Sequence, residues 1–163
     1  MNFLIVTGLS GAGKSMAVNA LEDIGFFCID NIPAGLLPRI LDFAQQGENQ
    51  LSRVAVVMDI RGLHSVQETN EALEALDEKK MPYDILFLDA SDAAIRRRYK
   101  ETRRVHPMTI SEGIPVSEAI TKERQILQPL RERAKYVIDT SLLSTAQNLS
   151  LIHISEPTRR RGI

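Results

Sequence analysis

Residues 8 to 15 combine glycines, a lysine and a serine at a spacing that suits phosphate chemistry. The segment reads G-L-S-G-A-G-K-S and fits the pattern G-x-x-x-x-G-K-[S/T] at every fixed position. Glycine lets the backbone approach an anion closely, and successive N–H groups then form a nest at the positive end of a following helix. In such a loop the lysine reaches the β and γ phosphates, and the serine hydroxyl ligates Mg²⁺. We therefore predict that a nucleoside triphosphate is bound by Gly8, Leu9, Ser10, Gly11, Ala12, Gly13, Lys14 and Ser15.

A plainer interpretation of the same stretch is a glycine-rich turn whose lysine is only solvated. The neighbouring residues favour the phosphate loop over this turn. An apolar run at residues 3–6 predicts a strand before the loop, and the pattern from residue 14 predicts a helix after it.

Magnesium needs a second protein ligand besides Ser15, and an aspartate at the end of a neighbouring strand commonly supplies it. Asp59 and Asp89 each follow an apolar, strand-like run, and either could instead cap the turn after it. Arg61 lies two residues beyond Asp59, so an acid and a base could both face the phosphates there. We therefore favour Asp59, and we predict that it acts in catalysis together with Lys14.

Five arginines crowd the stretch just after the fourth predicted strand. The first three, residues 96–98, fit a solvated helix face. Arg103 and Arg104 instead open an irregular segment at residues 102–115 that has no clear periodicity. In small P-loop kinases, arginines on a mobile lid close over the phosphates, and by this analogy we assign Arg103 a catalytic role. His106, next to a proline, fits a structural or loop histidine better than a general base.

The elements that would position these residues alternate between short apolar runs and longer helical patterns. Strands are expected at residues 3–7, 26–30, 54–59, 85–89 and 136–139. Helices are expected at residues 14–24, 36–45, 65–80, 92–99 and 116–134. Such a series predicts an α/β fold with a three-layer, doubly wound parallel sheet. Together with the loop motif, and by analogy with small kinases, it indicates a P-loop NTPase of the small-kinase type. Ligands would then bind beyond the carboxyl ends of the strands.

Composition and charge restrict the class of protein, its partners and its location. The 163 residues suit one domain, and 44% hydrophobic with 25% charged residues is ordinary for a soluble protein. A formal net charge of -1 gives no global attraction to nucleic acid. The longest apolar runs, about five or six residues, are too short to cross a bilayer, and Cys28 has no internal disulfide partner. We expect a cytoplasmic protein with no membrane contact.

Several collinear motifs resemble the RapZ/YvcJ family of bacterial P-loop nucleotide-binding proteins. Besides the loop, they are LEDIGFFCIDNIP at 21–33, DIRG at 59–62, FLDA at 87–90 and RRYKETRRVHP at 97–107. The resemblance runs to about Leu143. It implies a kinase-like amino-terminal domain that binds ATP at residues 8–15 and hydrolyses ATP and GTP slowly. It also implies a GTP-associated site formed by Asp59, Ile60, Arg61 and Gly62.

The same resemblance implies a regulatory role, because members of known role are regulators and one branch is an RNase adapter that binds small RNAs. In that family, RNA and sugar-phosphate binding lie on a second, carboxyl-terminal domain that these residues do not include. RNA and protein partners are therefore expected only through that second domain. A homo-oligomer is left open.

The last residues break the family pattern. Residues 149–163 look like the translation of a sequencing adapter, so we expect the nucleotide-binding domain to occupy residues 1–148. The literal alternative is a basic tail for nucleic acid, but a run of three arginines is too short to form a binding patch.

Three functions compete on this evidence. The favoured one is a regulatory domain that binds ATP or GTP with Mg²⁺ and has weak NTPase activity. The second is a small-molecule kinase, for which Asp30 ends the second strand where an acceptor could dock; Asp30 could equally cap the turn at residues 31–33. The third, an RNA-binding module, is disfavoured because the charge is near neutral and only 5% of residues are aromatic.

Overall fold

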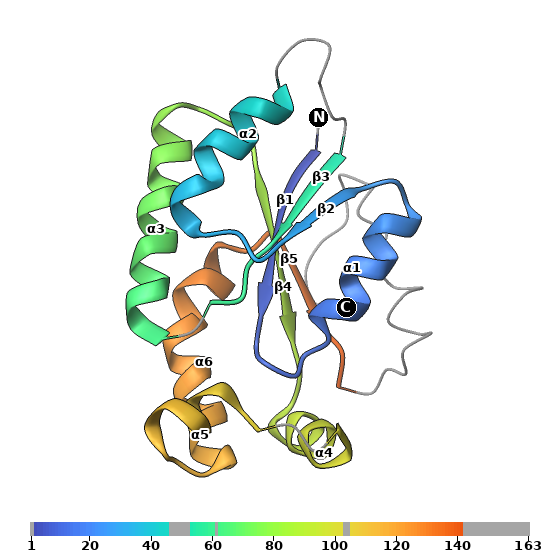
Figure 1. The fold of residues 1–163 in the computed structure, drawn as a ribbon, viewed down its shortest axis with the longest axis vertical. Helices are drawn as coiled ribbons and strands as arrows, with labels where there is room; N and C mark the ends of the chain where they lie inside the picture. The colour runs from blue at the N-terminus through green and yellow to red at the C-terminus, as the bar shows by residue number, and fades with distance from the viewer. Residues whose placement is uncertain (1, 46–52, 61, 103–104, 142–163) are drawn as a thin grey trace.

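The computed structural model is built on one parallel sheet, and it describes residues 2–45, 53–60, 62–102 and 105–141. The strand order is β2-β3-β1-β4-β5 (Figure 1). The strands are β1 (Asn2–Gly8), β2 (Phe27–Asp30), β3 (Arg53–Val57), β4 (Asp84–Asp89) and β5 (Tyr136–Asp139). β1 therefore lies at the centre, with β3 on one side and β4 on the other.

Helices cover both faces of this sheet (Figure 1). They are α1 (Lys14–Asp23), the 3₁₀ turn η1 (Ala34–Leu36), α2 (Leu37–Gln45), α3 (Gly62–Glu78), α4 (Asp92–Thr102), α5 (Pro107–Glu112) and α6 (Val116–Arg133). α2, α3 and α6 pack side by side on one face, and α1 packs on the other against β1, β2 and β3. Of the helices in the described part of the chain, none has the length and apolar character needed to cross a membrane.

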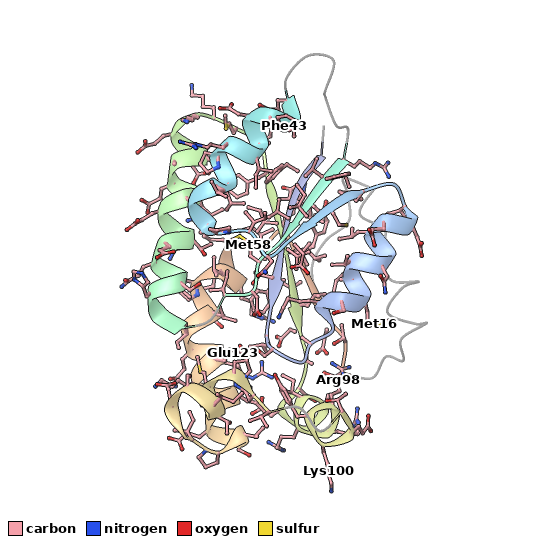
Figure 2. All side chains as sticks on the ribbon, viewed as in Figure 1. Met16, Phe43, Met58, Arg98, Lys100 and Glu123 are labelled. Atoms are coloured by element: carbon pink, nitrogen blue, oxygen red, sulfur yellow. The ribbon has the colours of Figure 1, made fainter. Side chains whose placement is uncertain are left out.

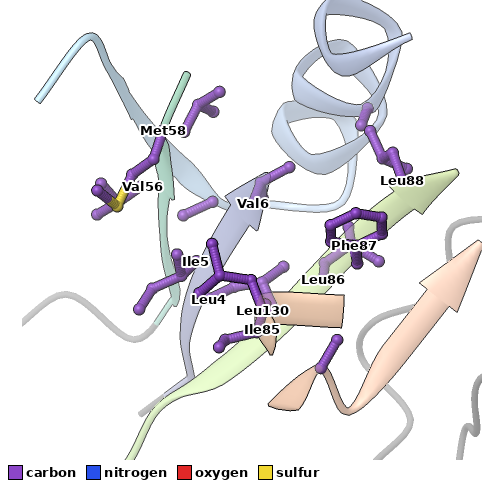
Figure 3. Close-up of a cluster of buried hydrophobic side chains, with 14 of the residues drawn as sticks. Leu4, Ile5, Val6, Val56, Met58, Ile85, Leu86, Phe87, Leu88 and Leu130 are labelled. Atoms are coloured by element: carbon purple, nitrogen blue, oxygen red, sulfur yellow. The ribbon is translucent and has the colours of Figure 1, made fainter. Parts of the chain in front are cut away.

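The central strands are apolar along their length because helices cover them on both sides. In β1 each side chain of residues 3–6 is at most 3% exposed, and in β4 those of residues 85–88 are at most 2% exposed. Leu130 of α6 packs against this cluster (Figure 3). The nearly continuous apolar runs are those of a parallel sheet buried on both faces, and the predicted α/β fold is confirmed.

The chain order places the carboxyl end of β1 at a switch point. From β1 the chain runs outward to β2 and returns to β3, and then crosses to β4 and β5 on the other side. The connections after β1 and β3 thus leave in opposite directions. Open α/β sheets bind their ligands at such a point, and here the glycine-rich loop follows β1 at this position.

Two expectations about elements are corrected by the structure. β3 ends at Val57, so Asp59 follows the strand by two residues instead of ending it. The segment at residues 102–115, expected to be irregular, contains the short helix α5, which begins after His106 and ends at Gly113 in a left-handed conformation. A helix of six residues is too short to show a periodic apolar pattern, although the proline at its first position and the glycine after its end are typical helix boundaries.

Candidate phosphate-binding site

The loop after β1 begins at Gly8, where the backbone of β1 lies close to that of β4. A Cβ atom on Gly8 would lie 2.3 Å from the carbonyl oxygen of Leu88, and Gly8 adopts a φ of +154°. The same carbonyl accepts the N–H of Leu9 at 3.1 Å. Only glycine fits this space and this backbone conformation. The first glycine of the pattern therefore fixes the point at which the chain turns out of the sheet.

The loop ends at the amino terminus of α1. Gly13 is the N-cap residue with a φ of 96°, and no side chain caps the helix. The first N–H groups of a helix carry partial positive charge and have no partner within the helix. An uncapped helix start beside a glycine cradle fits a phosphate group, and the exposed Ser15 in the first turn fits a Mg²⁺ ion held with that phosphate.

Lys14 folds back over the start of the loop. Its Nζ donates hydrogen bonds to the carbonyl oxygens of Gly8 at 3.1 Å and Leu9 at 3.2 Å. The side chain is half-buried. The ammonium charge is thus held at the loop, where a bound polyanion would meet it.

α4 and the turn after β5 hold the middle of the loop from outside. Arg98 donates to the carbonyl of Gly11 at 3.0 Å and to Thr140 Oγ1 at 3.0 Å, and the Thr140 hydroxyl donates to the carbonyl of Ala12 at 2.9 Å. Burial, with a smaller effect of neighbouring Arg97, lowers the pKa of the Arg98 guanidinium, which stays charged at physiological pH. The prediction that Arg98 lies on a solvated helix face is therefore wrong. Its position three residues after buried Ile95 was the available signal.

Sequence reasoning also missed a buried carboxylate beside the loop. Glu123 of α6 is 3% exposed and accepts hydrogen bonds from the backbone and the hydroxyl of Ser10. His106 is fully buried, lies 3.2 Å from Glu123 and caps α5, which agrees with its interpretation as a structural histidine. Glu123 lies three residues after Ile120 and four before Leu127, both buried, so helical spacing places a charge on the apolar face of α6.

The two candidate magnesium ligands have different surroundings. Asp89 accepts hydrogen bonds from Arg124 Nη1 at 2.9 Å, Arg131 Nε at 3.1 Å and the N–H of Ala90 at 2.7 Å. Its carboxylate is therefore committed to joining β4 to α6. Asp59 is exposed and follows Met58, whose N–H donates to the carbonyl of Val6 near the end of β1.

The other predicted residues lie partly within and partly outside the described part of the chain. Ile60 is buried and Gly62 begins α3, whereas Arg61, Arg103 and Arg104 lie outside the described residues. Asp30 accepts the N–H of Asn31 at 2.7 Å, so it caps its own turn.

The parallel sheet, the switch-point loop and the glycine-started helix define an α/β protein of the P-loop kinase-like class. The family model for the RapZ-like N-terminal domain matches residues 1–154, and the chain belongs to that family. A "Nucleotide-binding protein" of Alkaliphilus oremlandii is 46% identical over 147 residues, covering 90% of this chain and 50% of that relative. The chain thus spans about half the length of the curated relatives it matches.

Solved structures agree with this fold. The tunicamycin resistance protein of Deinococcus radiodurans matches with a TM-score of 0.60 at 16% identity, covering 99% of each chain. A shikimate kinase from Acinetobacter baumannii in complex with shikimate matches with a TM-score of 0.59 at 16% identity, covering 98% of this chain and 96% of that one. At this identity the likeness concerns the fold alone.

Proposed function

We propose that residues 8–15 bind ATP or GTP as the Mg²⁺ complex. The observation that carries this proposal is the uncapped start of α1 behind a glycine loop, with the Lys14 ammonium bonded to the carbonyls of Gly8 and Leu9. Lys14 would turn to the β and γ phosphates, and Ser15 and Asp59 would share the metal ion. The names of the relatives, nucleotide-binding proteins, support the same ligand class.

The reaction we propose for this site is slow hydrolysis of the bound triphosphate. Phosphoryl transfer to water depends mainly on positioning and on neutralising charge, and Lys14 and the loop N–H groups supply both. Arg61, Arg103 and Arg104 are our candidates for stabilising the transition state. A GTP contact at Asp59, Ile60, Arg61 and Gly62 belongs to the same proposal.

We further propose a regulatory role in the cytoplasm. RNA and protein partners would contact the remainder of a longer protein, because the chain covers about half of its relatives. Incubation with γ-labelled ATP and a metabolite extract separates this role from a small-molecule kinase. Label released as inorganic phosphate supports the regulator, whereas label transferred to a metabolite supports the kinase.

Titration calorimetry with ATP and with GTP, each in the presence of Mg²⁺, tests the binding proposal. Lys14→Ala should weaken binding by about a hundredfold or more, because it removes the cation that meets the β and γ phosphates. Lys79→Ala is the matched control, since Lys79 is exposed between the end of α3 and the start of β4, whereas the loop follows the end of β1. Equal affinity of the Lys14→Ala variant and the wild type would refute the proposal.

A further inference from the structure

A buried carboxylate lies directly against the loop that we propose binds phosphate. Glu123 Oε1 accepts the backbone N–H of Ser10 at 3.0 Å, and Oε2 accepts the Ser10 hydroxyl at 2.7 Å. Both residues are buried, at 3% and 8% exposure. Two hydrogen bonds to one residue fix its backbone and its side-chain rotamer together. Figure 2 shows Glu123 on α6 near the carboxyl-terminal end of the sheet.

The same carboxylate also contacts the start of α5. His106 Nε2 lies 3.2 Å from Glu123 Oε1, and His106 Nδ1 accepts the N–H of Met108 at 3.1 Å. Because Nδ1 is an acceptor, the ring proton must lie on Nε2, which therefore donates to Glu123. Glu123 thus accepts from three donors, two on the loop and one at the cap of α5. These three hydrogen bonds offset the free energy that the carboxylate loses when it is removed from water.

The charge of Glu123 does not suit a direct contact with a polyanion, because like charges repel most strongly where water is excluded. Its hydrogen bonds suit the loop itself. Arg98 and Thr140 hold the carbonyls of the next two residues, and Glu123 holds Ser10, so three successive residues are fixed from outside. A loop fixed in this way loses little conformational entropy when a ligand binds.

We propose that Glu123 is a positioning residue that sets the conformation of Ser10 and couples the phosphate loop to the amino terminus of α5 through His106. The inference rests on the proposed function, since it concerns how the same loop is prepared for a triphosphate. Coupling of this kind is reciprocal. A ligand that moves Ser10 changes the surroundings of His106, and a displacement of α5 changes the affinity of the loop.

Glu123→Gln and Glu123→Ala separate hydrogen bonding from charge. The glutamine oxygen accepts from Ser10 N–H and His106, and its NH₂ group donates to the Ser10 hydroxyl, so the contacts persist without the charge. We expect Glu123→Gln to bind Mg²⁺–ATP within about threefold of wild type, and Glu123→Ala to bind about tenfold or more weakly. Exposed Glu118 on the same helix provides the control Glu118→Ala. Binding by Glu123→Gln that is tighter than wild type by more than about threefold would overturn the proposal, because Glu123 would then act as a repulsive charge.

Hydrogen exchange without nucleotide gives a readout that does not depend on the proposed function. The Ser10 amide should exchange about tenfold faster or more in Glu123→Ala than in wild type, with Glu123→Gln close to wild type. If the alanine variant does not fold, Ser10→Ala replaces it in the titration, and wild type is compared with Glu123→Gln in the exchange experiment. Wild type that binds neither triphosphate refutes the proposed function and leaves this comparison intact. An unprotected Ser10 amide in the wild type overturns the positioning role.

The coupling to α5 is tested by the NMR signal of the His106 ring. Saturating Mg²⁺–ATP should shift this signal in wild type and leave it unchanged in Glu123→Ala at matched saturation. A wild-type protein that binds ATP with no change at His106 would overturn the coupling.

Discussion

The charged side chains around the loop are each paired with backbone or hydroxyl groups of opposite polarity. Lys14 and Arg98 donate to loop carbonyls, and Glu123 accepts from a loop N–H and a hydroxyl. Cations thereby meet the negative ends of the peptide groups, and the one anion meets a positive end. The N–H groups that begin α1 are left uncapped by any side chain. The charges thus stabilise the loop and leave the N–H groups that begin α1 for a phosphate.

A glycine series tests the close approach that starts the loop. Gly8→Ala should lower the free energy of unfolding by about 3 kcal/mol or more, because its Cβ would overlap the backbone of Leu88. Gly25→Ala meets no atom within 4 Å, so its positive φ alone should cost about 1 kcal/mol. Gly35→Ala, with neither problem, should change stability by less than about 0.5 kcal/mol. Urea unfolding measures all three, and equal losses for Gly8→Ala and Gly25→Ala would show that no close contact exists.

The thiol of Cys28 should react slowly although it is only half-buried. Burial, followed by the charge of Glu22, raises the pKa of Cys28 from 9.0 to about 11. At pH 8 the thiolate, which is the reactive form, should be about a hundredfold scarcer than in the unfolded chain. Because the folded protein holds this proton more tightly, stability contributed by Cys28 is present below pH 9 and is lost as pH rises toward 11.

Alkylation rates measured from pH 7 to 10.5 check this shift. The rate should keep rising across the range in the folded protein, and it should level off near the ordinary thiol pKa in denaturant. A plateau near pH 9 for the folded protein would show that the pKa of Cys28 is not raised.

At the scale of elements, Asp59, two residues after β3, and Asp89, at the end of β4, should have opposite effects when each is mutated. Asp59→Ala should remove most of the Mg²⁺-dependent part of the ATP affinity and change stability by less than about 0.5 kcal/mol. Asp89→Ala should lower the free energy of unfolding by about 1–3 kcal/mol, because Arg124 and Arg131 lose their shared partner, and leave the affinity within about threefold. Titrations with and without Mg²⁺, paired with unfolding curves, decide between them. The reverse pattern would assign the metal ion to Asp89.

Element type was predictable wherever a long periodic or apolar pattern existed. The predicted strand at residues 136–139 coincides with β5, and the helix predicted to begin at Lys14 does so. α5 was missed because six residues hold less than two turns of periodicity. The end of β3 was placed two residues late because Met58 continues the apolar run beyond the last ladder residue.

At the scale of the whole molecule, local motifs were easier to predict than the contacts that support them. The G-x-x-x-x-G-K-S spacing is contiguous, so the loop could be found in the sequence alone. Arg98 and Glu123 contact the loop at residues 87 and 113 positions away in the sequence, and no short sequence pattern predicts contacts over such separations. From the sequence, Arg98 and Glu123 could be recognised only as charged residues at helix positions whose spacing predicts burial. Which loop atom each one contacts depends on the packing of α4 and α6 around the sheet.

The hydrogen bond from Thr140 to the carbonyl of Ala12 joins positions 128 residues apart. Because Thr140 directly follows β5, that contact forms only when β5 has paired with β4, after most of the described residues have been synthesised. A ribosome-bound chain halted before this strand emerges would therefore carry the loop motif without its complete scaffold. Full affinity for a ligand would then require β5 and Thr140 to be in place. Chains in which they have folded would bind the ligand more tightly than chains still being synthesised.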